Sequence, residues 1–204
     1  MQFYKEMVQR QLYLDGGDRV LCSKNPLFST KMRSIIETFP DARFIYMARN
    51  PYEAIPSVQS MLWNMWTGAW CDTPKDGEAV RLLGEVSIQV YKYAFEVLDE
   101  LPDDRYVMVK YDDLVSDPQA TVKTIYDRLG MDISPEYEAI LLEEANKAKG
   151  YKSKHSYSLE EFGLSAERVR EELPEVFERF GWDPIATAPP SAEVEVEGEA
   201  RSSA

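Results

Sequence analysis

Three short apolar runs, each followed by a longer stretch with helical periodicity, most constrain the fold of this chain. The runs cover residues 19–24, 43–48 and 106–110, and each has the length of a short buried strand. Strands that alternate with helices of ten or more residues are typical of a parallel sheet with helices on both faces. The sequence therefore predicts an α/β fold.

Capping residues mark where several of the helices begin. Asn50 stands before Pro51, with an acid at position 53, and Asp117 stands before Pro118. Both patterns are typical of a helix start. Apolar residues spaced by three and four predict further helices over residues 3–14, 32–39, 76–101, 135–148 and 165–180.

The length and composition predict one folded domain and a tail. The chain has 204 residues, of which 44% are hydrophobic, and this is enough to bury one core. We assign residues 1–185 to a single α/β domain. Residues 186–204 contain prolines, small residues and four glutamates but little that can pack, so they predict a disordered acidic tail.

The charge and the apolar pattern exclude several classes of protein. The formal net charge of −13 repels nucleic acid and anionic membranes, and no basic patch counters it. No apolar stretch approaches the roughly 20 residues that a membrane span needs. Residues 1–15 are too polar for the core of a signal peptide.

The numbers of cysteine and histidine residues, and the absence of a glycine-rich phosphate-binding motif from the sequence, exclude further classes of protein. The two cysteines, Cys22 and Cys71, are too few for a disulfide framework. We therefore expect a cytoplasmic protein in a reducing compartment, with Cys22 buried in the first strand. Because the sequence has only one histidine, it cannot contain a metal-binding motif that needs two, and no GxxxxGK[ST] segment is present. Zinc hydrolases and ordinary nucleotide triphosphatases are thus excluded.

Polar residues follow each predicted strand. Lys24, Arg49 and Tyr111 stand at the three carboxyl ends, where an open parallel sheet binds its ligands. Arg49 precedes a helix N-terminus, whose positive dipole end favours an anion, and Ser57 lies two turns further along that helix. The alternative is that Arg49 is solvated at a strand end and Ser57 is an ordinary helix residue.

These residues carry a family resemblance. The segment ARNPYEAIPS, in which Arg49 and Ser57 are eight residues apart, resembles the segment by which sulfotransferases bind the 3′-phosphate of 3′-phosphoadenosine 5′-phosphosulfate (PAPS). The similarity covers most of residues 19–182, in order, through the segments LCSKNPLFSTKMRSIIETFPDARFIYMARNP, VKYDDLVSDPQATVKTIYDRLGM and HSYSLEEFGLSAERV.

The resemblance implies an activity and roles for single residues. Sulfotransferases have a P-loop-like α/β fold and transfer a sulfuryl group from PAPS, without a metal, to a hydroxyl or amine of a small-molecule, glycan or peptide acceptor. Arg49 and Ser57 would bind the 3′-phosphate. The other implied positions are Tyr111 at the adenosine end, Lys24 at the sulfuryl group or bridging phosphate, and Lys152 and Lys154 as further nucleotide contacts. Without the resemblance, the residues themselves favour a half-buried tyrosine that closes a strand and solvated lysines.

The chain also departs from the family pattern. Family members begin with a strand and a phosphate-binding loop of the type Pro-x-x-[Ser/Thr]-Gly-Thr-[Ser/Thr], which these residues do not contain, so we expect an N-terminally incomplete fold. Phe28 stands where many relatives have a histidine as general base, and Glu37, Glu53 and Asp112 are possible substitutes. The alternative function is a non-catalytic nucleotide-binding remnant, or a fragment that needs a partner segment and associates through an exposed sheet edge.

A cluster of tryptophans follows Ser57. Trp63, Trp66 and Trp70 are spaced by three and four, which predicts one buried helix stripe. The alternative is a pocket for a hydrophobic acceptor.

Overall fold

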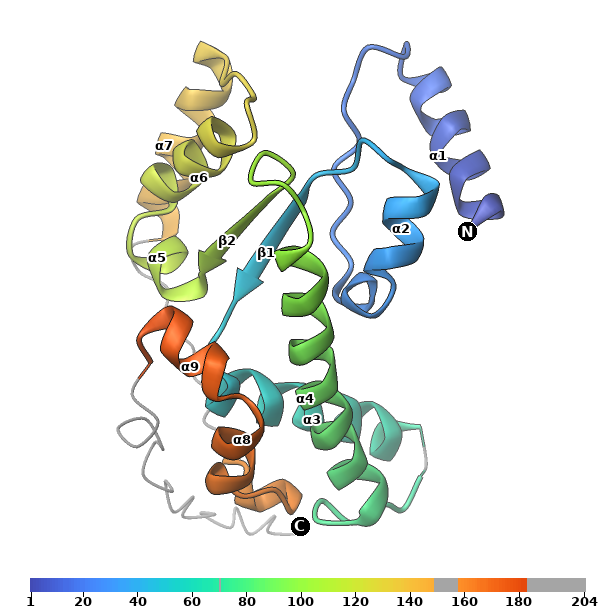
Figure 1. The fold of residues 1–204 in the computed structure, drawn as a ribbon, viewed down its shortest axis with the longest axis vertical. Coiled ribbons are helices and arrows are strands. Elements are labelled where there is room, and N and C mark those ends of the chain that lie inside the picture. The colour runs from blue at the N-terminus through green and yellow to red at the C-terminus, as the bar shows by residue number, and fades with distance from the viewer. Residues whose placement is uncertain (70, 149–157, 183–204) are drawn as a thin grey trace, which may run out of the picture.

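The computed structural model describes residues 1–69, 71–148 and 158–182. In it, helices surround a small parallel sheet (Figure 1). The elements follow in the order α1 Gln2–Leu14, the 3₁₀ turn η1 Pro26–Thr30, α2 Met32–Thr38, β1 Phe44–Ala48, α3 Pro51–Gly68, α4 Glu78–Asp99, β2 Tyr106–Lys110, α5 Tyr111–Ser116, α6 Pro118–Arg128, α7 Pro135–Ala148, the 3₁₀ turn η2 Glu160–Phe162, α8 Ala166–Glu172 and α9 Pro174–Phe180.

The sheet confirms the predicted α/β class. β1 and β2 run parallel, with Phe44 opposite Tyr106 and Ala48 opposite Lys110. The helices α3 and α4 connect the two strands, as a parallel pair requires. The predicted strands at 43–48 and 106–110 are therefore both confirmed.

The prediction of a strand at residues 19–24 is wrong. The segment is extended, but among the described residues it forms no backbone hydrogen bond. Val20 is 85% exposed and Leu21 40%, and Cys22 is exposed rather than buried. A strand needs a neighbour to satisfy its backbone groups, and the described residues supply none. Lys24 therefore does not stand at the end of a strand.

Helices cover both faces of the sheet. On one face, Ala48 packs in a core with Tyr91 and Phe95 of α4 and Phe177 of α9. On the other, Val107 and Val109 pack against Ile125 and Leu129 at α6. This agrees with the expectation of helices on both faces.

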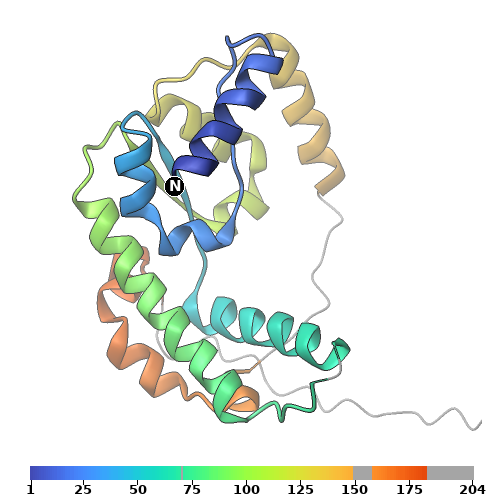
Figure 2. The same cartoon turned by 90° about the vertical axis from the view of Figure 1, so that its right-hand side faces the viewer.

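The tryptophan stripe is not buried as predicted. The first half of α3 is buried through Ile55 and Gln59, but in its second half Met61 is 55% exposed and Met65 62%. Trp63 and Trp66 are only partly buried, and Trp70 lies outside the described residues. Figure 2 shows this half of α3 running outward, away from the sheet. Helical spacing predicts which side chains share a face, and the structure leaves Trp63 and Trp66 on that face partly exposed.

Local signals placed most helix ends correctly. The side chains of Asn50 and Asp117 accept hydrogen bonds from the N–H groups of Tyr52 and Ala120, each at 3.0 Å, which confirms both caps. The predicted helix at 165–180 is instead two helices, α8 and α9, because Pro174 has no N–H to donate and its ring disfavours a helical residue before it.

Some predictions lie outside the described residues. The proposed end of the domain at residue 185 and the acidic tail at 186–204 both fall there. No helix within the described ranges is long and apolar enough to cross a membrane.

Candidate functional site

The ends of the two parallel strands bring Arg49 and Tyr111 together. Ala48 is opposite Lys110, so the next residue of each chain segment leaves the same edge of the sheet. The guanidinium carbon of Arg49 lies 5.0 Å from the centroid of the Tyr111 ring. This is a cation–π contact, which an aromatic quadrupole favours. The predicted meeting of strand-end residues therefore holds for this pair.

Glu53 binds a second side of the same guanidinium. The Nε and Nη2 groups of Arg49 both donate to Oε2 of Glu53, each at 3.1 Å. Glu53 stands one turn along the chain from Arg49, in the first turn of α3. Both side chains are partly exposed, so the ion pair is screened by solvent. The ion pair orients the guanidinium and neutralises part of its charge.

The backbone of Arg49 is held from the core. The hydroxyl of Tyr91, on α4, donates to the carbonyl oxygen of Arg49 at 2.8 Å. Burial raises the pKa of Tyr91 far above its usual value, so the phenol stays protonated and remains a donor. Together with the Asn50 cap, this contact fixes where β1 ends and α3 begins.

The start of α3 favours an anion near Arg49. The N–H groups in the first turn of a helix point outward along its axis, and the helix dipole places partial positive charge there. α3 is 18 residues long, and Arg49 stands just before its N-cap. The site thus combines a charged side chain and a helix terminus, the combination that binds phosphate groups.

Ser57 and Lys24 are not joined to Arg49 in the structure. Ser57 is partly buried on α3, just after the buried Pro56, and among the described residues no hydrogen bond links it to Arg49. Lys24 is exposed on the extended segment before η1. Lys152 and Lys154, with the single histidine His155, lie outside the described residues. The roles expected for these residues stay predictions.

Sequence reasoning missed two contacts of Arg49. Glu53 was assigned to helix capping, although its spacing of four from Arg49 also suits an ion pair on a helix. Tyr91 lies 42 residues away from Arg49, and no short-range pattern points to it. Of the possible general bases, Glu37 and Asp112 are exposed, and Glu53 is the one that contacts Arg49.

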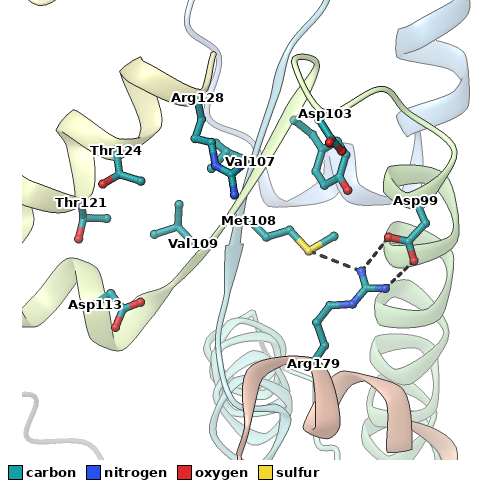
Figure 3. A pocket seen from close by; sticks show the side chains of 11 residues that line it. Asp99, Asp103, Val107, Met108, Val109, Asp113, Thr121, Thr124, Arg128 and Arg179 are labelled. Atoms are coloured by element: carbon teal, nitrogen blue, oxygen red, sulfur yellow. Dashed lines mark hydrogen bonds and ion pairs between the residues drawn. The ribbon is translucent and has the colours of Figure 1, made fainter. Parts of the chain in front are cut away.

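A separate cavity of about 570 Å³ lies along the outer side of β2. Figure 3 shows Arg179 inside it, donating to both carboxylate oxygens of Asp99 at 2.8 and 2.7 Å. Its other charged lining residues are Asp103, Asp113 and Arg128. Arg49, Ser57 and Tyr111 do not line it, so this cavity is separate from the candidate site at Arg49. Within the described ranges, no three metal-binding side chains gather.

Comparison with protein families and curated proteins gives one consistent result. The model of the sulfotransferase family matches residues 1–135. The omega-hydroxy-beta-dihydromenaquinone-9 sulfotransferases Stf3 of Mycobacterium bovis and Mycobacterium tuberculosis are 26% identical over 183 residues, which is 85% of this chain and 44% of theirs. The chain thus spans less than half the length of these curated relatives.

Solved sulfotransferases share the fold. The sulfotransferase STF9 from Mycobacterium avium matches with a TM-score of 0.63 and 21% identity, over 77% of this chain and 41% of that one. STF1 from Mycobacterium tuberculosis gives 0.56 and 25%, over 74% and 38%. The sulfotransferase domain from the curacin biosynthetic pathway gives 0.55 and 18%, over 87% and 68%.

Proposed function

Because this chain belongs to the sulfotransferase family, we propose that it binds PAPS at Arg49 and takes part in transferring the sulfuryl group to a hydroxyl or amine acceptor. The observation that carries the proposal is the Arg49 guanidinium, held between the ring of Tyr111 and the carboxylate of Glu53 at the start of α3. The 3′-phosphate is the group we assign to it.

The geometry of Arg49 leaves donors for a phosphate. Glu53 takes the edge formed by Nε and Nη2, and Tyr111 covers one face. Among the described residues, the Nη1 group has no hydrogen-bond acceptor. A guanidinium whose face and one edge are already held loses little further freedom when it binds an oxyanion through its remaining N–H groups.

The remaining predicted residues have roles in the transfer itself. The acceptor attacks the sulfur in line while the bond to the bridging phosphate oxygen breaks, so negative charge develops on that phosphate. Lys24 is proposed to stabilise this charge, Ser57 to add a second contact to the 3′-phosphate, and Lys152 and Lys154 to bind the nucleotide. A base that takes the acceptor proton is also needed. No metal has a role in this scheme.

The acceptor is proposed to carry a hydroxyl. The two curated relatives are named for an omega-hydroxylated dihydromenaquinone, which favours a hydroxyl over an amine. The low cysteine content supports a cytoplasmic location for the reaction.

Calorimetry with two nucleotides tests the assignment of Arg49. Adenosine 3′,5′-bisphosphate should bind the intact chain, and Arg49→Ala should weaken it by about 1.5–3 kcal/mol, the size of a hydrogen bond to a charged group. Adenosine 5′-monophosphate lacks the 3′-phosphate, so its binding should be unaffected by the same substitution. The matched control is Arg128→Ala, which removes an arginine from the cavity of Figure 3. If Arg128→Ala weakens the binding of the bisphosphate and Arg49→Ala does not, the nucleotide binds in the cavity.

A second candidate function is a nucleotide-binding chain that does not catalyse the transfer alone. It is favoured by the sequence, which has no Pro-x-x-[Ser/Thr]-Gly-Thr-[Ser/Thr] segment to wrap the 5′-phosphosulfate. The two candidates differ in one assay. If the chain binds adenosine 3′,5′-bisphosphate but transfers no sulfuryl group from PAPS to a panel of phenols and alcohols, the second candidate holds.

A further inference from the structure

Tyr91 connects the core to the candidate site through one hydrogen bond. It lies on α4, is only 9% exposed, and packs in the core with Ala48 of β1 and Phe177 of α9. Figure 1 shows α4 running past the junction of β1 and α3. At that junction the hydroxyl of Tyr91 donates to the carbonyl of Arg49 at 2.8 Å. A buried hydroxyl costs free energy unless it is hydrogen-bonded, and among the described residues this is the bond that satisfies it.

The carbonyl of Arg49 lies beyond the paired part of the sheet. The register of β1 against β2 ends at Ala48, which is opposite Lys110. Among the described residues, no backbone N–H donates to the carbonyl of Arg49. On the other side of this carbonyl, Asn50 caps α3. The side chain of Tyr91 therefore holds the peptide group that lies between the sheet and the helix.

This peptide group sets the direction in which the Arg49 side chain leaves the backbone. A peptide group is planar, so a fixed carbonyl restricts rotation about the Cα–C bond of Arg49. The far end of the side chain is held by Glu53, at 3.1 Å, and by the ring of Tyr111, at 5.0 Å from its centroid. Arg49 is thus held both at its backbone and at its guanidinium. A group held in this way loses less freedom when it binds a ligand.

The phenol of Tyr91 remains a donor at neutral pH. Burial raises the pKa of Tyr91 far above its ordinary value, so the hydroxyl keeps its proton and its bond to the carbonyl of Arg49. A phosphate monoester is mostly doubly charged at the same pH. The contact that holds Arg49 and the charge that Arg49 would bind are therefore present together.

Tyr93 forms a similar bond elsewhere on α4. Its hydroxyl accepts a hydrogen bond from the backbone N–H of Arg33, in α2, at 3.2 Å. Residues two apart on a helix do not face each other, so Tyr91 and Tyr93 bond backbone groups on different sides of α4. Of the two, Tyr91 is the one that bonds the candidate site, and Tyr93 provides a matched control.

We propose that Tyr91 is a positioning residue for nucleotide binding, which acts through the backbone of Arg49 and does not touch the ligand. Its hydroxyl holds Arg49 so that the guanidinium meets the 3′-phosphate. Binding groups need to be held within about 0.5 Å of their productive geometry, and a released carbonyl allows larger shifts. This role rests on the proposed function and deepens it, because it names a residue of the core that sets the affinity for the 3′-phosphate.

Calorimetry on the intact chain tests this role. Tyr91→Phe keeps the ring and removes the hydroxyl, and it should weaken the binding of adenosine 3′,5′-bisphosphate about three- to tenfold, the equivalent of one hydrogen bond. The binding of adenosine 5′-monophosphate, which lacks the 3′-phosphate, should be unchanged. Tyr93→Phe is the matched control and should bind both nucleotides like the native chain. Circular dichroism checks that both variants are folded.

A double-mutant cycle separates positioning from stability. Arg49→Ala removes the guanidinium but keeps the carbonyl to which Tyr91 donates. In the Arg49→Ala background, Tyr91→Phe should therefore not weaken the binding of the bisphosphate any further. It should still lower the free energy of unfolding by the same amount in both backgrounds. A residue with a structural role alone would give equal losses of binding with and without the Arg49 side chain.

Three results would overturn the role of Tyr91. The first is native affinity for the bisphosphate in folded Tyr91→Phe, and the second is an equal loss of affinity for adenosine 5′-monophosphate. The third is an undiminished effect of Tyr91→Phe in the Arg49→Ala background. In each case the native chain still binds the bisphosphate and Arg49→Ala still weakens that binding, so the proposed function stands. If the native chain does not bind the bisphosphate, the proposed function fails, and the role of Tyr91 fails with it.

Discussion

The guanidinium of Arg49 lies over the ring of Tyr111, 5.0 Å from the ring centroid. Arg49 follows β1 and Tyr111 begins α5 directly after β2, so the contact joins the two strand ends. Glu53 and Tyr91 add contacts to the side chain and the backbone of Arg49. Arg49 is therefore held by residues from three separate elements, α3, α4 and α5, before any ligand binds.

Tyr111→Leu should weaken the binding of adenosine 3′,5′-bisphosphate. The substitution removes the aromatic face that supports Arg49, and a cation–π contact at a partly exposed site contributes about 0.5–1 kcal/mol. Tyr111→Phe keeps the ring and should bind like the native chain in isothermal titration calorimetry. Equal losses for the two variants would show that the phenol hydroxyl, and not the ring, matters.

Glu53→Gln should strengthen binding of the same nucleotide. The carboxylate of Glu53 neutralises part of the Arg49 charge, and the gain should stay below about 1 kcal/mol because the pair is partly exposed. Glu6→Gln is the control, since Glu6 forms an ion pair of the same spacing with Arg10 on α1. The measurement is calorimetry at low and high salt, and weaker binding for Glu53→Gln would mean that orientation of Arg49 outweighs its neutralisation.

The protein should lose stability in alkali through Tyr91. Burial raises the pKa of Tyr91 above its unfolded value of about 10. Such a group stabilises the fold fully below its unfolded pKa, and this contribution is lost as the pH rises toward the folded pKa. The free energy of unfolding, from urea titrations between about pH 7 and about pH 11, should therefore fall at the alkaline end.

Tyr91→Phe tests which group is responsible. It should cost about 0.5–1.5 kcal/mol near neutral pH, because the carbonyl of Arg49 loses its donor, and it should reduce the alkaline decline. Tyr46 is partly buried, and desolvation raises its pKa as well, so part of the decline should remain. An unchanged decline in Tyr91→Phe would assign it to Tyr46 instead.

Gly84→Ala should destabilise the packing of α3 against α4. A Cβ atom on Gly84 would lie 2.8 Å from Nε2 of Gln59 and 3.0 Å from Cδ2 of Leu164. Gln59 is fully buried and donates to the carbonyl of Val80 at 2.9 Å, so it cannot move without losing that bond. We expect a loss of about 1–3 kcal/mol in urea unfolding.

The same substitution elsewhere provides the control. Gly68, the last residue of α3, has nothing within 4 Å of the position of an added Cβ. Gly68→Ala should be neutral or stabilise by up to about 1 kcal/mol, from helix propensity. Equal effects at the two glycines would argue against a packing cause at Gly84.

The sequence correctly predicted those elements whose signals lie within a few residues of one another. The caps at Asn50 and Asp117 were confirmed because a cap depends on residues two or three positions away. The run at 19–24 was predicted as a strand for its apolar residues, but pairing depends on a neighbouring strand. The prediction that the tryptophan stripe is buried was wrong for a related reason. Spacing indicates which side chains share a face of a helix, but not what covers that face.

The candidate site was predictable only in part. Parallel strands end at one edge, and this brought Arg49 and Tyr111 to the same place as expected. The pairing of Glu53 with Arg49 competes with its capping role, and the choice between them depends on geometry. The contact from Tyr91 reaches across 42 residues, so the helix that carries it had to be placed first. The roles of Ser57 and Lys24 stay predictions.

The register of β1 against β2 limits how the chain can vary in length. Ala48 is opposite Lys110, and inserting or deleting a single residue within either strand would turn every later side chain to the other face of the sheet. Arg49 and Tyr111 would then no longer meet. The connection through α3 and α4 has no such constraint between its ends. Homologous chains should therefore tolerate insertions after Gly68, and none within the two strands.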